Sequence, residues 1–132
     1  MKKNSWGRII NMTSVSVKEP LSYLALSNSM RSSVISWAKT LSNDIGHNNV
    51  TVNNILTGYF DTERLKELNL DKAKKFNVDV DELYDIMRNQ VPLGRIGKPE
   101  EFGYLITFLA SEYASYINGA NIPIDGGLLK SI

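Results

Sequence analysis

Two short apolar strands with one long helical segment between them constrain the fold of this chain most strongly. Residues 7–14, GRIINMTS, form an apolar run closed by polar residues, and residues 49–58, NVTVNNILTG, are rich in β-branched side chains. Both patterns are typical of buried strands. Residues 24–45, between them, have the period of a helix. This order predicts a βαβ unit with parallel strands and a right-handed crossover.

The helix expected over residues 24–45 carries apolar residues on two faces. One face holds Val34, Ile35, Ala38, Leu41 and Ile45, and the second holds Leu26, Met30, Ser33 and Trp37. Two apolar faces predict burial on two sides, by a sheet on one side and by something else on the other.

The rest of the chain continues the alternation of helices and strands. Residues 61–90 are helical and charged, which favours a mobile helical insertion over a cleft, and a pair of solvated helices explains the pattern equally well. Pro99 suits the first turn of a helix over residues 99–112. Residues 120–127, ANIPIDGG, predict a last short strand. No repeat or interdomain linker separates these elements, so we expect one α/β domain.

Composition excludes several classes of function. The 132 residues contain 15 Lys and Arg against 14 Asp and Glu, and this balance gives no reason to expect a nucleic acid or a membrane as partner. No apolar run approaches the ~20 residues that span a bilayer. With one histidine and no cysteine we expect no metal site, and the lack of cysteine fits a cytoplasmic protein.

Several motifs occur in an order that resembles the C-terminal half of the short-chain dehydrogenase/reductase family. They run from Gly7 to Gly127: GRIIN with a closing serine, VNNI, GYFDT, PLGRIGKPEE, FLAS and NGANIPIDGG. The resemblance implies part of a doubly wound parallel, Rossmann-like sheet that binds NAD or NADP. No G-x-x-x-G-x-G follows a strand, so the family's N-terminal dinucleotide-binding half is missing. We therefore expect residues 1–132 to be a single partial domain, from a split gene, a truncated gene or a cut chain.

The resemblance also implies a catalytic site in which two residue types have changed. The family uses a serine, a tyrosine thirteen residues later, and a lysine four residues after that; here these positions hold Ser14, Ser27 and Arg31. Arginine keeps a permanent cation for the cofactor's ribose. An alkyl hydroxyl is less acidic and shorter than a phenol, and loss of a positioned acid–base group costs roughly 10²–10⁴-fold in rate. Tyr23, one helical turn before Ser27, is an alternative source of a phenol on the same face, but a surface or interface tyrosine is the favoured interpretation of this residue.

For the cofactor, the resemblance implies contacts from Arg31, Thr57, Gly58 and Thr62. Thr57 and Gly58 stand where the family has Pro-Gly, and glycine still permits a close backbone approach. Thr62 matches the family's contact to the cofactor's carboxamide. A purely structural role is the alternative for each: a strand-end hydroxyl for Ser14, and a polar helix face for Ser27 with Arg31.

Two functions follow from the resemblance. The first is NAD(P)-dependent hydride transfer to or from a small carbonyl or alcohol substrate, in a protein that needs the missing half. The second is a non-catalytic remnant or interaction module that keeps the family's dimerisation helices. The expected partner is a second copy of the chain or a complementing N-terminal half. We expect the isolated chain to be inactive and to bind the cofactor weakly or not at all.

Overall fold

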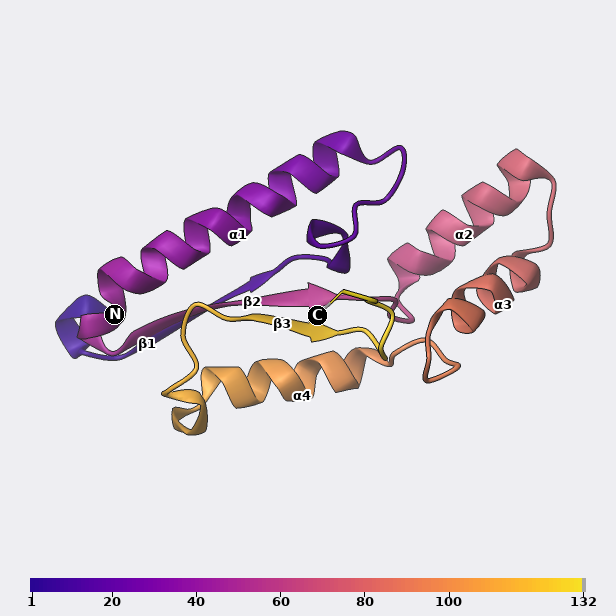
Figure 1. Ribbon diagram of the computed structural model, residues 1–132. Helices are drawn as coiled ribbons and strands as arrows, with labels where there is room; N and C mark the ends of the chain where they lie inside the picture. The colour runs from indigo at the N-terminus through magenta and orange to yellow at the C-terminus, as the bar shows by residue number, and fades with distance from the viewer. Residues whose placement is uncertain (132) are drawn as a thin grey trace.

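A three-stranded parallel sheet with a helix on each face forms the body of the protein (Figure 1). The computed structural model describes residues 1–131. The strands lie in the order β1 (Gly7–Met12), β2 (Val50–Thr57) and β3 (Asn121–Ile124), and both pairs are parallel. Helices α1 (Ala25–Ile45) and α4 (Pro99–Ala110) cover opposite faces. The predicted strand–helix–strand unit and the last short strand are therefore confirmed.

Each face of the sheet has its own apolar core. On one face, Val52 of β2 packs with Ala38 of α1 and with Ile9 of β1. On the other, Ile55 of β2 packs with Leu109 of α4. Because successive strand residues point to opposite faces, the central strand must be apolar on both, and residues 50–56 are all buried.

The side chains of a buried and an exposed asparagine fix the turn that leads into β3. The Asn53 side chain donates to the carbonyl of Ile117 (2.8 Å) and accepts from the backbone N–H of Ala120 (3.1 Å). The Asn118 side chain accepts from the N–H of Val52 (2.9 Å) and donates to the carbonyl of Ser42 in α1 (3.1 Å). These side-chain amides thus form hydrogen bonds with backbone N–H and carbonyl groups of β2, α1 and the turn that regular sheet and helix bonds leave open.

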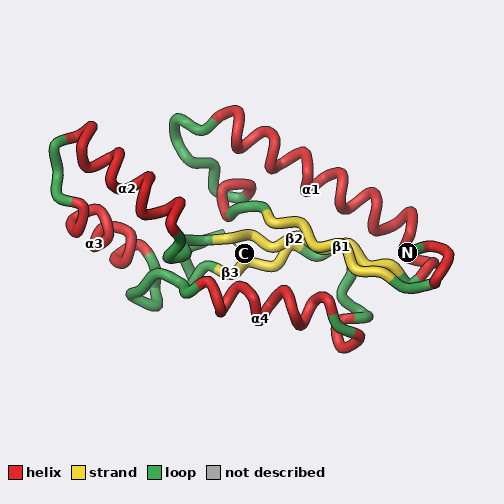
Figure 2. Tube along the Cα trace, turned by 180° about the vertical axis from the view of Figure 1, so that it is seen from behind, coloured by secondary structure: helices red, strands yellow, loops and turns green. Residues whose placement is uncertain are grey.

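Residues 61–90 form the predicted pair of helices, α2 (Glu63–Phe76) and α3 (Val80–Gln90). The pair projects past the ends of the strands, beside the sheet rather than over it (Figure 2). Asn69 is the only buried residue of the two helices. We call α2, α3 and their connecting loop the helical arm.

The two apolar faces of α1 have different surroundings. The first face packs on the sheet, as predicted, with Ala38 and Ile45 buried. On the second face, Leu26, Met30 and Trp37 are 78%, 63% and 52% exposed. Nothing in the described residues 1–131 covers that second face. Among the described residues 1–131, α1 and the other helices are too short or too polar to cross a membrane.

Candidate active site

Two cavities open where β1 and β2 end, and they share the wall formed by Thr57, Gly58 and Tyr59. The first, of about 540 Å³, lies toward the start of α2; we call it the arm cavity. The second, of about 520 Å³, lies toward residues 128–130; we call it the tail cavity. In doubly wound α/β proteins, ligands bind in the crevice at the carboxyl ends of the strands, which is the position of both cavities.

Arg31 and Ser27 lie together at the N-terminal end of α1. The Arg31 Nε donates to the Ser27 Oγ at 3.3 Å, as expected for residues four apart on one helix face. The Arg31 side chain lines the arm cavity, whereas Ser27 does not. Within the described residues Arg31 forms no ion pair, so its charge is free to meet a ligand.

Ser14 lies in the tail cavity, on the other side of the shared wall from Arg31. It follows β1 and caps a short 3₁₀ turn, where its Oγ accepts from the backbone N–H of Ser16 at 3.1 Å. The hydroxyl proton is not used by this bond and can still be donated. In the described part of the chain, no hydrogen bond joins Ser14 to Ser27 or to Arg31.

The other predicted cofactor residues all have contacts within the protein. The Thr57 Oγ1 donates to the carbonyl of Thr13 (2.5 Å) and ties the ends of β1 and β2 together. The Thr62 Oγ1 caps α2 by accepting from the N–H of Leu65 (3.3 Å). A Cβ on Gly58 would lie 2.7 Å from the Cα of Asp125. The close backbone approach that glycine permits at position 58 is therefore to the protein's own turn.

Tyr59 is a site residue that the sequence pattern did not single out. It lines both cavities, and its phenol donates to the Oε1 of Gln90, the last residue of α3, at 2.9 Å. Partial burial raises the pKa of this phenol, which keeps it protonated. Its place directly after Gly58 at the strand end was the available signal.

Tyr23 does not lie where its spacing predicts. Helix α1 begins at Ala25, so Tyr23 precedes the helix, with a left-handed backbone (φ 63°) and a fully exposed side chain. It lines neither cavity. The alternative in which its phenol shares a helix face with Ser27 is therefore excluded, and Tyr23 is the surface tyrosine that the sequence favoured.

One carboxylate in the lining of the tail cavity binds the backbone near the C-terminal end of the chain. The Glu19 Oε1 accepts from the backbone N–H groups of Lys130 (2.8 Å) and Ser131 (2.9 Å), and Glu19 and Lys130 both line the cavity. These two hydrogen bonds, which favour the ionised form, lower the pKa of the Glu19 carboxyl.

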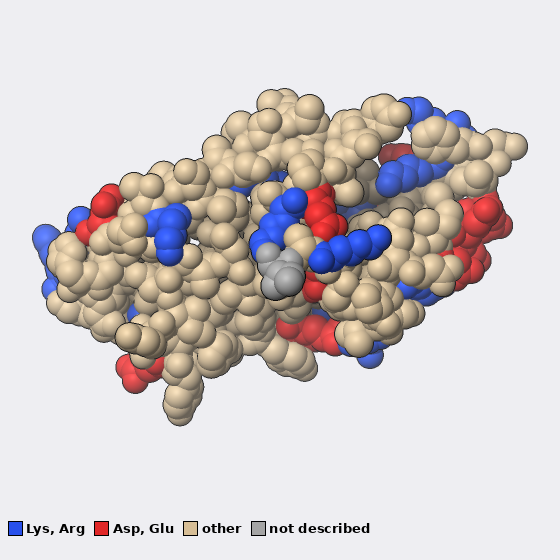
Figure 3. Space-filling model, viewed as in Figure 1, with Lys and Arg blue, Asp and Glu red and all other residues tan. Residues whose placement is uncertain are grey.

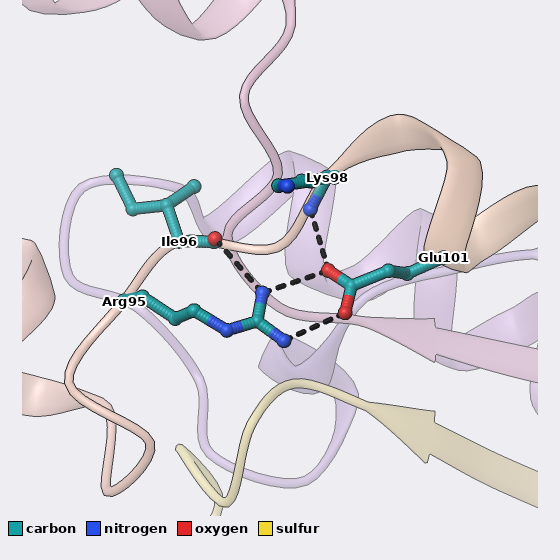
Figure 4. A network of polar contacts seen from close by, with 4 residues as sticks. All are labelled: Arg95, Ile96, Lys98 and Glu101. Atoms are coloured by element: carbon teal, nitrogen blue, oxygen red, sulfur yellow. Dashed lines mark hydrogen bonds and ion pairs between the residues drawn. The ribbon is translucent and has the colours of Figure 1, made fainter.

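A second carboxylate fixes the start of α4 beside the arm cavity (Figure 4). Glu101 receives two parallel bonds from the Arg95 guanidinium (2.6 and 2.8 Å) and one from the backbone N–H of Lys98 (2.8 Å). The Arg95 bonds, followed by the Lys98 bond, lower the pKa of Glu101 to about 2. Such bidentate pairs fix geometry as well as charge.

Comparison with known proteins identifies the family. A family model described as Enoyl-(Acyl carrier protein) reductase matches residues 1–129. A short chain dehydrogenase family protein from Francisella tularensis superimposes with a TM-score of 0.88 at 26% identity, over 92% of this chain and 50% of that one. The chain belongs to the short-chain dehydrogenase/reductase family. Its sheet is the C-terminal half of the family's Rossmann-like fold, as predicted.

Individual relatives show how much of a family member the chain represents. The NADPH-dependent reductase BacG of Bacillus subtilis is 36% identical over all of this chain and 51% of its own length. The 3-oxoacyl-[acyl-carrier-protein] reductase FabG of Pseudomonas aeruginosa is 31% identical over 99% of this chain and 49% of its own. L-sorbose reductase of Gluconobacter frateurii, solved with NADPH and L-sorbose, has a TM-score of 0.93 at 28% identity, over 100% of this chain and 51% of that one. The chain thus spans about half the length of these reductases.

Proposed function

We propose that this chain is the C-terminal half of an NAD(P)-dependent reductase and works with a complementing N-terminal half. One observation carries the proposal. The whole chain corresponds to one half of reductases such as the NADPH-dependent reductase BacG. The arm cavity at its strand ends is lined by Arg31, which forms no ion pair within the described residues, and by the hydroxyl groups of Thr57 and Thr62 among others. The substrate class we propose is a small carbonyl compound or the corresponding alcohol.

The residues of the arm cavity suit the nicotinamide end of the cofactor. Arg31 offers a fork of donors for ribose hydroxyls, and Thr57 and Thr62 offer hydroxyls beside it. The volume of about 540 Å³ is that of an ordinary small-molecule pocket. When bound, the cofactor supplies the hydride. A glycine-rich turn for the pyrophosphate does not occur in the sequence, so the adenosine end is assigned to the complementing half.

The chain's own hydroxyls orient the substrate and supply the proton in this proposal. From the tail cavity, the Ser14 hydroxyl donates a hydrogen bond that holds the substrate carbonyl, and Ser14 keeps its proton. Ser27 stands at the family's proton-transfer position behind Arg31 and lines neither cavity, so in this proposal it reaches the substrate only once the complementing half and the ligands are bound. Its contact with Arg31 lowers the cost of a developing negative charge on its oxygen. Because an alkyl hydroxyl is a weaker acid than a phenol, we expect slow turnover.

Reconstitution tests the proposal. The N-terminal half of B. subtilis BacG, up to the point where this chain begins to match, is co-expressed with residues 1–132. We expect a stable complex that binds NADPH in the micromolar range, whereas the isolated chain binds no better than roughly millimolar, about −4 kcal/mol. Micromolar binding by the isolated chain, or no complex at all, would contradict the proposal.

A repair experiment in the same complex tests the catalytic residues. Ser27→Tyr with Arg31→Lys places a phenol and an ammonium on one helix face, and we expect carbonyl reduction to rise roughly 10²-fold or more. Ser14→Ala in that background removes most of the gain. Ser33→Tyr with Arg31→Lys is the matched control, because Ser33 lies on the exposed face of α1. An unchanged rate in a repaired complex that still binds NADPH would mean that Ser27 with Arg31 is only a polar helix face.

A second candidate function is a non-catalytic interaction module. The exposed outer face of α1, with Leu26, Met30 and Trp37, favours this candidate, because large apolar patches mark interfaces. It predicts that residues 1–132 self-associate through α1, measured by sedimentation. Trp37→Glu then gives monomers, and Lys39→Glu, on the same helix, leaves the association unchanged. If neither variant changes the sedimentation of the protein, this candidate fails.

A further inference from the structure

The segment at residues 128–131, which we call the tail, belongs to no helix or strand, and its first three residues line the tail cavity. Asp125, in the preceding turn, holds the beginning of the tail. Its backbone carbonyl accepts from the N–H of Leu128 (3.2 Å), and its carboxylate accepts from the N–H groups of Gly127 and Leu129 (2.9 Å each). Because these bonds join residues close in sequence, they shape the tail locally and do not attach it to the rest of the protein.

Glu19 attaches the tail to the body of the protein. Its Oε1 accepts from the N–H groups of Lys130 and Ser131, which lie 111 and 112 positions away in the sequence. Among the described residues, these two bonds are the only hydrogen bonds between the tail and residues outside its own turn. Hydrogen bonds to an ionised acceptor are stronger than those between neutral groups. The position of the tail therefore depends on one carboxylate.

The turn that carries Glu19 also carries Ser14. Ser14 caps the short 3₁₀ turn Val15–Val17, and the N–H of Glu19 bonds to the carbonyl of Val15 at 3.1 Å. Val15 is buried, with 8% of its surface exposed, so the turn is anchored in the body. The hydroxyl that holds the substrate carbonyl in the proposed function and the carboxylate that holds the tail are therefore fixed relative to one another.

Apolar side chains make up much of the lining of the tail cavity. They are Val15, Leu21, Leu128 and Leu129. Two of the four belong to the tail, and both are partly buried in the two positions just before the N–H groups that Glu19 binds. A tail that moves away takes both of these leucines out of the cavity wall. The part of a ligand that gains most from this wall is an apolar chain.

We propose that Glu19 is a positioning residue for the substrate. By binding the last two N–H groups of the tail, it holds Leu128 and Leu129 in the wall of the tail cavity, and this wall selects carbonyl compounds that carry an apolar chain. The chain lies against the two leucines while the carbonyl oxygen meets Ser14. The proposal deepens the proposed function and rests on it in one respect: the compound that the wall selects is the one that is reduced.

Binding of two ketones to residues 1–132 tests the selection without a cofactor. Butyl methyl ketone has two more methylene groups than ethyl methyl ketone, and burial of these groups against the leucines makes it bind roughly tenfold tighter. In Glu19→Ala the tail is released, and we expect the preference to fall to roughly twofold or less. NMR titrations that follow the amide signals of Gly58 and Leu129 measure both affinities. Hydrogen exchange in the same variant is faster at the Lys130 and Ser131 amides.

Three further variants make the test specific to the tail. Lys18→Ala is the matched control, because Lys18 is the exposed neighbour of Glu19 in the same turn, and it leaves the preference unchanged. Glu19→Gln keeps an acceptor oxygen and retains part of the preference. Removal of residues 128–132 abolishes the preference, and Glu19→Ala in the shortened chain has no further effect. This lack of additivity separates the positioning of the tail from any other role of Glu19.

The reconstituted complex with the BacG half extends the test to turnover. There Glu19→Ala raises the KM for butyl methyl ketone roughly tenfold and changes kcat less than about twofold, because it removes binding and leaves the reacting groups in place.

Four results would overturn the inference: equal affinity of the two ketones, no binding of either, a preference that survives Glu19→Ala, or an equal loss in Lys18→Ala. If the ketones follow the rule and the BacG half restores no NADPH binding, only the proposed function fails. If the complex binds NADPH and reduces the ketones but the preference does not depend on Glu19, only the positioning role of Glu19 fails.

Discussion

The sheet body and the helical arm are held together by different forces. In the body, side chains far apart in sequence bury one another, as Ile55 and Leu109 do on the α4 face. In the arm, exposed ion pairs join residues three apart in sequence, such as Arg64 with Glu67 and Arg88 with Asp85. In Figure 3, charged side chains lie over α2 and α3, around the C-terminus in the middle of the face and at the left end, and most of the surface over α1 and α4 is uncharged. We therefore expect the body to carry most of the stability of the fold and the arm to open locally at a smaller cost.

The largest expected difference between the two regions is in the stability lost when a leucine side chain is shortened to alanine. Leu109→Ala in the body, where the side chain is 0% exposed, lowers the free energy of unfolding by about 2–5 kcal/mol. Leu70→Ala in the arm, 49% exposed, lowers it by about 0.5 kcal/mol. Urea unfolding of the two variants measures both values. Equal losses would show that the arm and the body unfold as one tightly coupled unit.

The second-largest expected difference between the body and the arm concerns substitutions of buried asparagines. Asn53→Leu leaves the carbonyl of Ile117 and the N–H of Ala120 without partners, and we expect a loss of about 2–3 kcal/mol in the free energy of unfolding. Asn69→Leu in the arm removes one bond to the sulfur of Met87 at 3.4 Å, a weak acceptor, and costs less than about 1 kcal/mol. A larger loss for Asn69→Leu, from the same urea titrations, would reverse the comparison.

Removal of a helix cap tests whether the helical arm unfolds locally while the sheet body stays folded. Thr62→Ala removes the cap of α2 and costs about 1 kcal/mol of helix stability. We expect faster hydrogen exchange of the α2 amides and little change in those of β2. Thr40→Ala is the control, because its hydroxyl bonds to the carbonyl of Ser36 inside α1 and caps nothing. Exchange that rises equally in α2 and β2 would mean that the arm does not open by itself.

The smallest expected effect is on the stability of the fold at acid pH. Bonds in the folded state lower the pKa of Glu101 from the usual 4.5 to about 2, so its ionised form stabilises the fold above pH 4.5, and this stabilisation is lost as the pH falls toward 2. Glu101→Gln flattens part of the stability profile in that range. The pKa of Glu19 is also lowered, so Glu19→Gln is measured beside it. A profile that neither substitution changes would show that both carboxylates titrate alike in the folded and unfolded states.

The sequence determined the elements of this protein and their order. Strand and helix patterns depend only on residues two to four positions apart in the sequence. The βαβ unit, the last strand and the helical pair could therefore all be predicted. The pairing of Ser27 with Arg31 was predictable for the same reason, since residues four apart on a helix always share a face. The family motifs depend on residue order alone, and they identified the half of the fold that is present.

Only the tertiary structure decided which residues that are far apart in the sequence lie close together in space. It placed Ser14 in a separate cavity from Arg31, brought Tyr59 between them, and put Tyr23 outside the helix. It also aligned Asn11, Asn54 and Asn121, which are far apart in the chain, into one ladder of side-chain hydrogen bonds across the sheet. Such meetings depend on strand register, on the residue at which a helix begins and on the path of the loops. No local pattern fixes these, because they follow from the packing of the whole chain.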